Sequence, residues 1–74
     1  MEYEYIYPDV EKLKKNPLKA DHIMRLAEEV GLKPIVARVD NYSGQVFFYF
    51  DKHLENEDKE KLDKLVDKLF KELK

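Results

Sequence analysis

Hydrophobic and polar residues alternate in three short segments of the chain, and each segment predicts a β-strand. The first, residues 2–7, reads Glu-Tyr-Glu-Tyr-Ile-Tyr and ends at Pro8. The second and third, residues 33–40 and 45–50, flank Asn-Tyr-Ser-Gly, which is typical of a turn, so together they predict a β-hairpin. The third is the most continuously apolar run and contains three of the four phenylalanines.

Helical spacing of apolar residues predicts the remaining elements. Asp9 can cap a short helical turn that runs through Lys15. Asn16 is expected to cap a second helix, with Pro17 as its first residue. Gly31 stands where this helix should end. The stripe that faces the core in this helix comprises Ala20, Ile23, Leu26, Ala27 and Val30.

The last helix has the strongest periodic signal. Asn56 is expected to cap it, and its apolar stripe comprises Leu62, Leu65, Val66, Leu69, Phe70 and Leu73. Oppositely charged residues four apart are expected to support its exposed side, in the pairs Glu57–Lys61, Glu60–Lys64 and Asp67–Lys71.

The order strand, helices, strand, strand, helix predicts one α+β domain over residues 1–74. A right-handed crossover places both helical segments on one face of the sheet and gives the strand order 1-3-2, with the third strand antiparallel to both neighbours. The prediction is a three-stranded mixed or antiparallel sheet that looks like a ferredoxin-like fold without its last strand.

Strand alternation assigns side chains to the two faces of this sheet. Towards the helices we expect Ile35, Ala37, Val39, Val46, Phe48 and Phe50. On the uncovered face we expect Val36, Arg38, Asp40, Phe47 and Tyr49. Ile6 is expected on the uncovered face too, because turning Tyr3, Tyr5 and Tyr7 outward would bury Glu4.

Composition limits the class of protein. A chain of 74 residues without cysteine has a thin core and neither a disulfide nor a thiolate metal site to stabilise it. The abundance of Lys and Glu resembles hyperthermophile proteins or designed mini-proteins, and irregular features such as Pro17, His22 and Met24 favour a natural source. We expect a soluble cytoplasmic protein without membrane association, because no long apolar run or basic, apolar leader is found.

Candidate chemistry is sparse, and we expect neither an enzyme nor a bound cofactor. Apart from tyrosine, Ser43 has the only side-chain hydroxyl, and it lies in the predicted turn. His22 falls at the margin of a helix stripe. His53 lies two residues from Asp51, but no third metal ligand is suggested.

The segment of residues 43–50 resembles the third-strand motif of RNA-recognition-motif domains at Gly44, Phe47 and Phe50. The resemblance implies that Phe47 stacks on bases from the outer face of the sheet. Ser43 stands where that family has a basic residue, Gln45 stands where it has its first stacking aromatic, and the fourth strand is missing. These departures do not assign the chain to that family.

The uncovered face therefore carries the functional expectation. We expect an interaction module that forms a homodimer through this face or along the free edge of the first strand. The interaction surface comprises Phe47, Tyr49, Val36, Arg38 and Ile6. The alternative is single-stranded nucleic acid bound by Phe47 and Tyr49 with help from Arg38, although the net charge of −2 disfavours general binding to phosphates.

Overall fold

The computed structural model describes residues 1–73 and shows an α+β fold built on a three-stranded antiparallel sheet. The strand order is β1-β3-β2, as the sequence predicted. The elements in chain order are β1 (Glu2–Ile6), α1 (Val10–Lys15), α2 (Ala20–Glu29), β2 (Val36–Asp40), β3 (Gln45–Tyr49) and α3 (Asn56–Glu72). The comparison with a ferredoxin-like fold stays a prediction.

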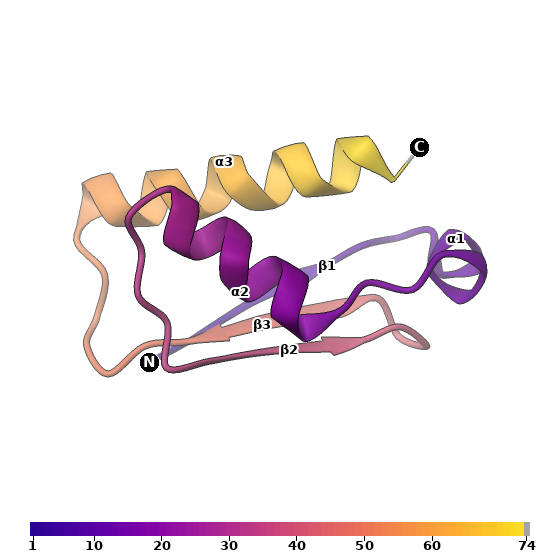
Figure 1. Ribbon diagram of the computed structural model, residues 1–74, viewed down its shortest axis with the longest axis horizontal. Coiled ribbons are helices and arrows are strands. Elements are labelled where there is room, and N and C mark those ends of the chain that lie inside the picture. The colour runs from indigo at the N-terminus through magenta and orange to yellow at the C-terminus, as the bar shows by residue number, and fades with distance from the viewer. Residues whose placement is uncertain (74) are drawn as a thin grey trace.

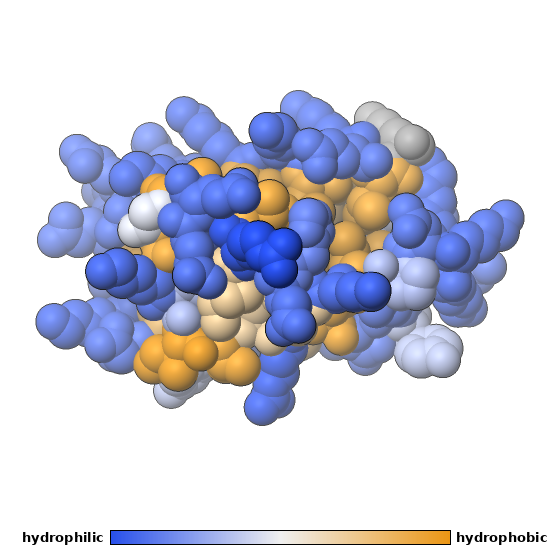
Figure 2. Space-filling model, viewed as in Figure 1, coloured by the Kyte–Doolittle hydropathy of each residue, from blue (hydrophilic) through white to orange (hydrophobic). Residues whose placement is uncertain are grey.

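The long helices α2 and α3 lie on the same side of the sheet, and α1 lies beyond the end of the strands (Figure 1). Within residues 1–73, no helix lies over the other face of the sheet (Figure 1). Among the residues described, no helix is long and apolar enough to cross a membrane. In the view of Figure 2, polar side chains cover much of the helical side, and an exposed apolar group lies at the lower left, where β2 begins.

The core lies between the sheet and the helices, and the even-numbered residues of β3 are at its centre. Val46 and Phe48 are completely buried, and Phe50, just after the strand, is nearly so. They pack among the buried side chains of the helices and neighbouring strands, namely Tyr7, Leu13, Leu18, Ile23, Ala27, Leu32, Ala37, Leu62, Leu65, Val66 and Leu69. Strand alternation thus places half of β3 in the core and leaves the other half outside.

The second helix begins three residues later than predicted. Asn16 is the C-cap of α1 rather than the N-cap of α2, and Lys19 precedes the first turn of α2. The reason is a contact from the hairpin turn. The side chain of Asn41 accepts a hydrogen bond from the Leu18 N–H (2.9 Å) and donates one to the Leu18 carbonyl (3.1 Å), which holds both backbone groups of Leu18 outside the helix.

The predicted caps of the other two helices have different outcomes. Asp9 caps α1 as expected, since its side chain accepts a hydrogen bond from the Lys12 N–H. At α3, however, Glu55 occupies the cap position without a side-chain hydrogen bond, and Asn56 is the first helical residue. The carbonyl of Glu55 accepts the first helical hydrogen bond, from Lys59, so the helix starts at the residue expected to cap it.

Only one of the three predicted ion pairs on α3 forms among residues 1–73, between Asp67 and Lys71 at 2.9 Å. The expected Glu57–Lys61 pair is replaced by a longer contact of 3.9 Å between Asp58 and Lys61. No ion pair in the described part of the chain joins Glu60 to Lys64. A third pair, Lys59–Asp63, was not predicted, and it connects α3 to β1 through Tyr5.

Strand alternation assigned Ile35 to the wrong face. It was expected in the core, but its side chain is 59% exposed. The strand begins only at Val36, and Ile35 follows Pro34 in a bend. Strand alternation therefore does not extend to it, because the regular pleat starts at Val36, three residues after the predicted start at residue 33.

The two glycines provide a matched test of the turn. Both have positive φ, +84° at Gly31 and +79° at Gly44. A β-carbon at Gly31 would meet open space, whereas one at Gly44 would overlap the carbonyl oxygen of Tyr7. We predict that Gly31→Ala costs about 1 kcal/mol and Gly44→Ala about 3 kcal/mol in urea unfolding. Equal losses would contradict the close approach of β1 to the turn.

Candidate functional site

The candidate site is the face of the sheet opposite to α2 and α3, called here the open face. Cross-strand pairing arranges its side chains in three rows that each run from β1 through β3 to β2. The rows are Glu2–Tyr49–Val36, Glu4–Phe47–Arg38 and Ile6–Gln45–Asp40.

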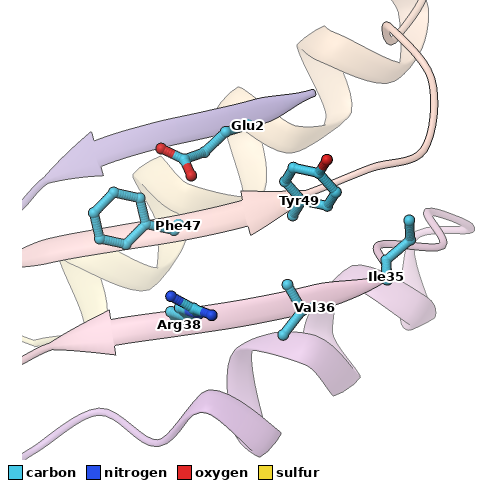
Figure 3. Close-up of a pocket in the computed structure, with 6 residues that line it drawn as sticks. All are labelled: Glu2, Ile35, Val36, Arg38, Phe47 and Tyr49. Carbon is cyan, nitrogen blue, oxygen red and sulfur yellow. The ribbon is translucent and has the colours of Figure 1, made fainter.

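Two of these rows surround an open hollow of about 380 Å³. It is lined by Glu2, Ile35, Val36, Arg38, Phe47 and Tyr49. Figure 3 shows these side chains on the near side of the sheet, with the helices behind it. The ring of Phe47, on the central strand β3, lies between β1 and β2 and beside Arg38. Tyr49 lies further along β3. The floor of the hollow is therefore aromatic and its sides carry opposite charges.

The structure brings four of the five predicted surface residues together at this hollow. Phe47 is partly exposed, while Tyr49 and Val36 are 44% and 39% exposed, and Arg38 is exposed beside them. Ile6 is on the same face and 61% exposed, but it belongs to the third row, outside the hollow.

Sequence reasoning missed two residues of the hollow. Glu2 shares its row with Tyr49, and strand alternation could have placed it there once Ile6 was placed. Ile35 was missed because its position depends on where β2 starts, which alternation alone does not fix.

Around the rings of Phe47 and Tyr49, charges on the open face are separated by strand. The carboxylates of Glu2 and Glu4 project from β1, and the guanidinium of Arg38 projects from β2. Glu4 accepts a hydrogen bond from the Gln45 amide at 2.9 Å. No ion pair among residues 1–73 involves Arg38. Carboxylates therefore stand on the β1 side of the rings of Phe47 and Tyr49, and a guanidinium stands on the β2 side, where Asp40 follows in the third row.

Asp40, at the end of β2, is already engaged by the hairpin turn. Its carboxylate accepts hydrogen bonds from the backbone N–H groups of Tyr42 (2.9 Å) and Ser43 (3.3 Å). These bonds lower the pKa of Asp40 below its ordinary value, and the bond from Tyr42 has the largest effect. Asp40 is thus a structural carboxylate of the turn.

The tyrosines of β1 lie on the helical side and attach this strand to α3. The hydroxyl of Tyr5 donates a hydrogen bond to Asp63 at 2.6 Å, and Lys59 reaches the same carboxylate at 2.6 Å. The Lys59 ammonium also lies over the rings of Tyr3 and Tyr5, at 5.6 and 5.4 Å from their centroids. Tyr3 accepts a hydrogen bond from the Leu54 N–H.

This cluster shifts the ionisation of two of its members. Burial, and then the hydrogen bond to Asp63, raise the pKa of Tyr5 above its ordinary value. The hydrogen bonds from Lys59 and from Tyr5 lower the pKa of Asp63. Because both β1 tyrosines are engaged here, Phe47 and Tyr49 are the aromatic rings that remain on the open face.

The outer edge of β1 is acidic as well as unpaired among the described residues. The odd-numbered residues of β1 and its flanks direct their backbone groups towards β3. The Met1 carbonyl accepts a hydrogen bond from the Phe50 N–H, and the Tyr7 N–H donates one to the Gly44 carbonyl. The backbone groups of Glu2, Glu4 and Ile6 therefore point to the outer edge, since these directions alternate along a strand. Charged residues at an edge discourage further strand pairing.

The two histidines lie apart from the open face. His22 is exposed and lines a second shallow hollow, between α2 and the end of α3. His53 is exposed too, with its ring 6.3 Å from that of Tyr3. No group of three His, Asp or Glu side chains in residues 1–73 is arranged to hold a metal ion.

The Asp63 cluster leads to a prediction about pH. The folded-state pKa of Asp63 is depressed, so its contribution to stability is present above the unfolded pKa of about 3.9 and is lost as pH falls through the folded value. Asp63→Asn should therefore lower the free energy of unfolding at neutral pH by less than about 1 kcal/mol, because the pair is exposed, and reduce the further loss on acidification. Urea unfolding at several pH values tests this, with Asp67→Asn as the matched control. An unchanged acid dependence in Asp63→Asn would contradict it.

The site must be interpreted from its own geometry. Comparison with protein-family models, with curated proteins and with solved structures finds no match to this chain. What the geometry offers is a flat aromatic face, partly hollowed and lined by opposite charges on its two sides.

Proposed function

We propose that this protein is a small interaction module that self-associates through the open face. The observation that carries the proposal is the contiguous group of Phe47, Tyr49, Val36 and Ile35 on the side of the sheet without helices. Contiguous exposed apolar groups of this kind mark contact surfaces more often than isolated ones do. A second copy of the chain would cover the rings of both molecules at once.

The size of the open face predicts the strength of the association. Three strands of five residues make a face about 17 Å long and about 15 Å wide. The area of such a face, the product of these two lengths, is well below the roughly 800 Å² that each partner contributes to a stable interface. The proposal is therefore a reversible dimer whose population depends on concentration, rather than a permanent one.

The open face is favoured over the outer edge of β1 as the contact surface. An added strand at that edge would approach two glutamates, and a second copy would bring two more. The face instead offers apolar side chains that are at least a third exposed, including Tyr49 and Val36. Burying these side chains in the interface favours association by about 25 cal/mol per Å² of apolar area removed from water.

Single-stranded nucleic acid is the second candidate for the same surface. Phe47 and Tyr49 are suitably placed to stack on bases, and Arg38 could contact a phosphate. However, Glu2 and Glu4 line the other side of the same rings and would repel a phosphate backbone. The charge pattern therefore favours a protein partner.

Phe47→Glu tests the proposal. Wild-type protein should show a rising average mass with concentration in sedimentation equilibrium, and the variant should stay monomeric because each interface would bury two carboxylates. Circular dichroism should show that the variant is folded, since Phe47 lies outside the core. Tyr42→Glu, at a turn residue that is 82% exposed, is the control and should dimerise normally. A monomeric wild type at high concentration would overturn the proposal.

Titration of labelled single-stranded DNA and RNA at low and high salt tests the second candidate. We expect no saturable binding at low salt, because of the carboxylates around the rings. Binding that is lost in both Phe47→Ala and Arg38→Ala would instead assign the open face to nucleic acid.

A further inference from the structure

We infer that the two copies pack with their twofold axis along the central strands, so that Glu4 of each copy pairs with the partner's Arg38. This inference rests on the proposed self-association and specifies its geometry. The observation behind it is the separation of charge across Phe47. Glu4 and Arg38 are the direct cross-strand neighbours of Phe47 on its two sides.

Symmetry allows two arrangements of identical sheets that pack face to face in the aligned geometry. Aligned sheets cross at about 30°, and a twofold axis in the interface must then lie close to the strand direction or close to its perpendicular. An axis along the strands places β1 over the partner's β2, and every row of the open face then meets the same row of the partner. An axis across the strands places β1 over the partner's β1.

The charges distinguish these arrangements. With the axis along the strands, Phe47 faces the partner's Phe47, and Glu4 faces the partner's Arg38. The twofold axis repeats the Glu4–Arg38 contact, so each dimer has two of them. With the axis across the strands and through the Phe47 row, Glu4 faces the partner's Glu4 and Arg38 faces the partner's Arg38. Juxtaposed like charges are unfavourable at an interface, so the first arrangement is selected.

Arg38 and Glu4 have no comparable partnership within one chain. They are two strand spacings apart, about 10 Å, with Phe47 between them. No ion pair links them among residues 1–73. The second copy therefore supplies the opposite charge that neither side chain has in the single chain, and the apolar rings between them are covered in the same step.

Charge exchange tests the arrangement. Glu4→Lys and Arg38→Glu should each weaken the homodimer about tenfold or more in sedimentation equilibrium, because each replaces two attractive pairs by two repulsive ones. The double variant Glu4→Lys/Arg38→Glu should restore dimerisation to near the wild-type level. It is the matched control, since it has the same composition of charges on the open face as the wild type.

The Glu4→Lys variant gives the sharpest contrast. Among the charged residues of the open face, Glu2, Glu4 and Asp40 outnumber Arg38, so this substitution removes net negative charge. Simple charge repulsion therefore predicts a stronger dimer, whereas the pairing inferred here predicts a weaker one. A Glu4→Lys dimer as strong as the wild type would overturn the arrangement while leaving self-association intact, and a monomeric wild type would overturn both.

Cross-linking offers a readout that does not depend on charge. The chain has no cysteine, so Gln45→Cys introduces a unique thiol on the central strand. With the axis along the strands, position 45 faces itself, and a short bismaleimide should link the two copies. With the axis across the strands, position 45 faces position 49, and the two thiols would be about 13 Å apart. Failure of Gln45→Cys to cross-link in a sample that sedimentation shows to be dimeric would contradict the arrangement.

Discussion

The structure depends on the hydrogen bonding of β3 to a neighbouring strand on each side. This strand pairs with β1 and β2, and helices cover only one of its two faces. Val46 and Phe48 are therefore enclosed completely, and the side chains between them are directed away from the helices. A chain of this size has few other residues for a core, so Val46 and Phe48 must be apolar, and the helices protect only their side of β3.

The second face of β3 is where structure leads to function. Tyr3 and Tyr5 of β1 are held on the helical side by Leu54, Lys59 and Asp63, which leaves Phe47 and Tyr49 as the rings outside. Carboxylates stand on one side of these rings and a guanidinium on the other. A second copy related by a twofold axis along the strands would cover this apolar strip and set each carboxylate side against the partner's guanidinium. This complementarity supports the proposal of a symmetric pair.

Local chemistry in the sequence predicted the parts of the fold that depend on nearby residues. Alternation in β3, the Asn-Tyr-Ser-Gly turn and the Asp9 cap are all fixed by a few consecutive residues, and all three are present. The strand order followed from the handedness of the crossover. Four of the five predicted surface residues lie together because pairing in the hairpin places Val36 opposite Tyr49 and Arg38 opposite Phe47.

Contacts between distant residues account for what the sequence did not predict. The bond between Asn41 and Leu18 spans 23 residues, and it delays the start of α2 that Asn16 and Pro17 locally favour. Ile35 is exposed because β2 begins at Val36, three residues after the predicted start at residue 33.

A dilution series followed by nuclear magnetic resonance tests the central claim most directly, since it maps the contact surface without a substitution. The account predicts concentration-dependent shifts at Glu4, Arg38, Phe47 and Tyr49, with the outward surfaces of α2 and α3 unchanged. Shifts confined to the helices, or none at any concentration, would contradict it.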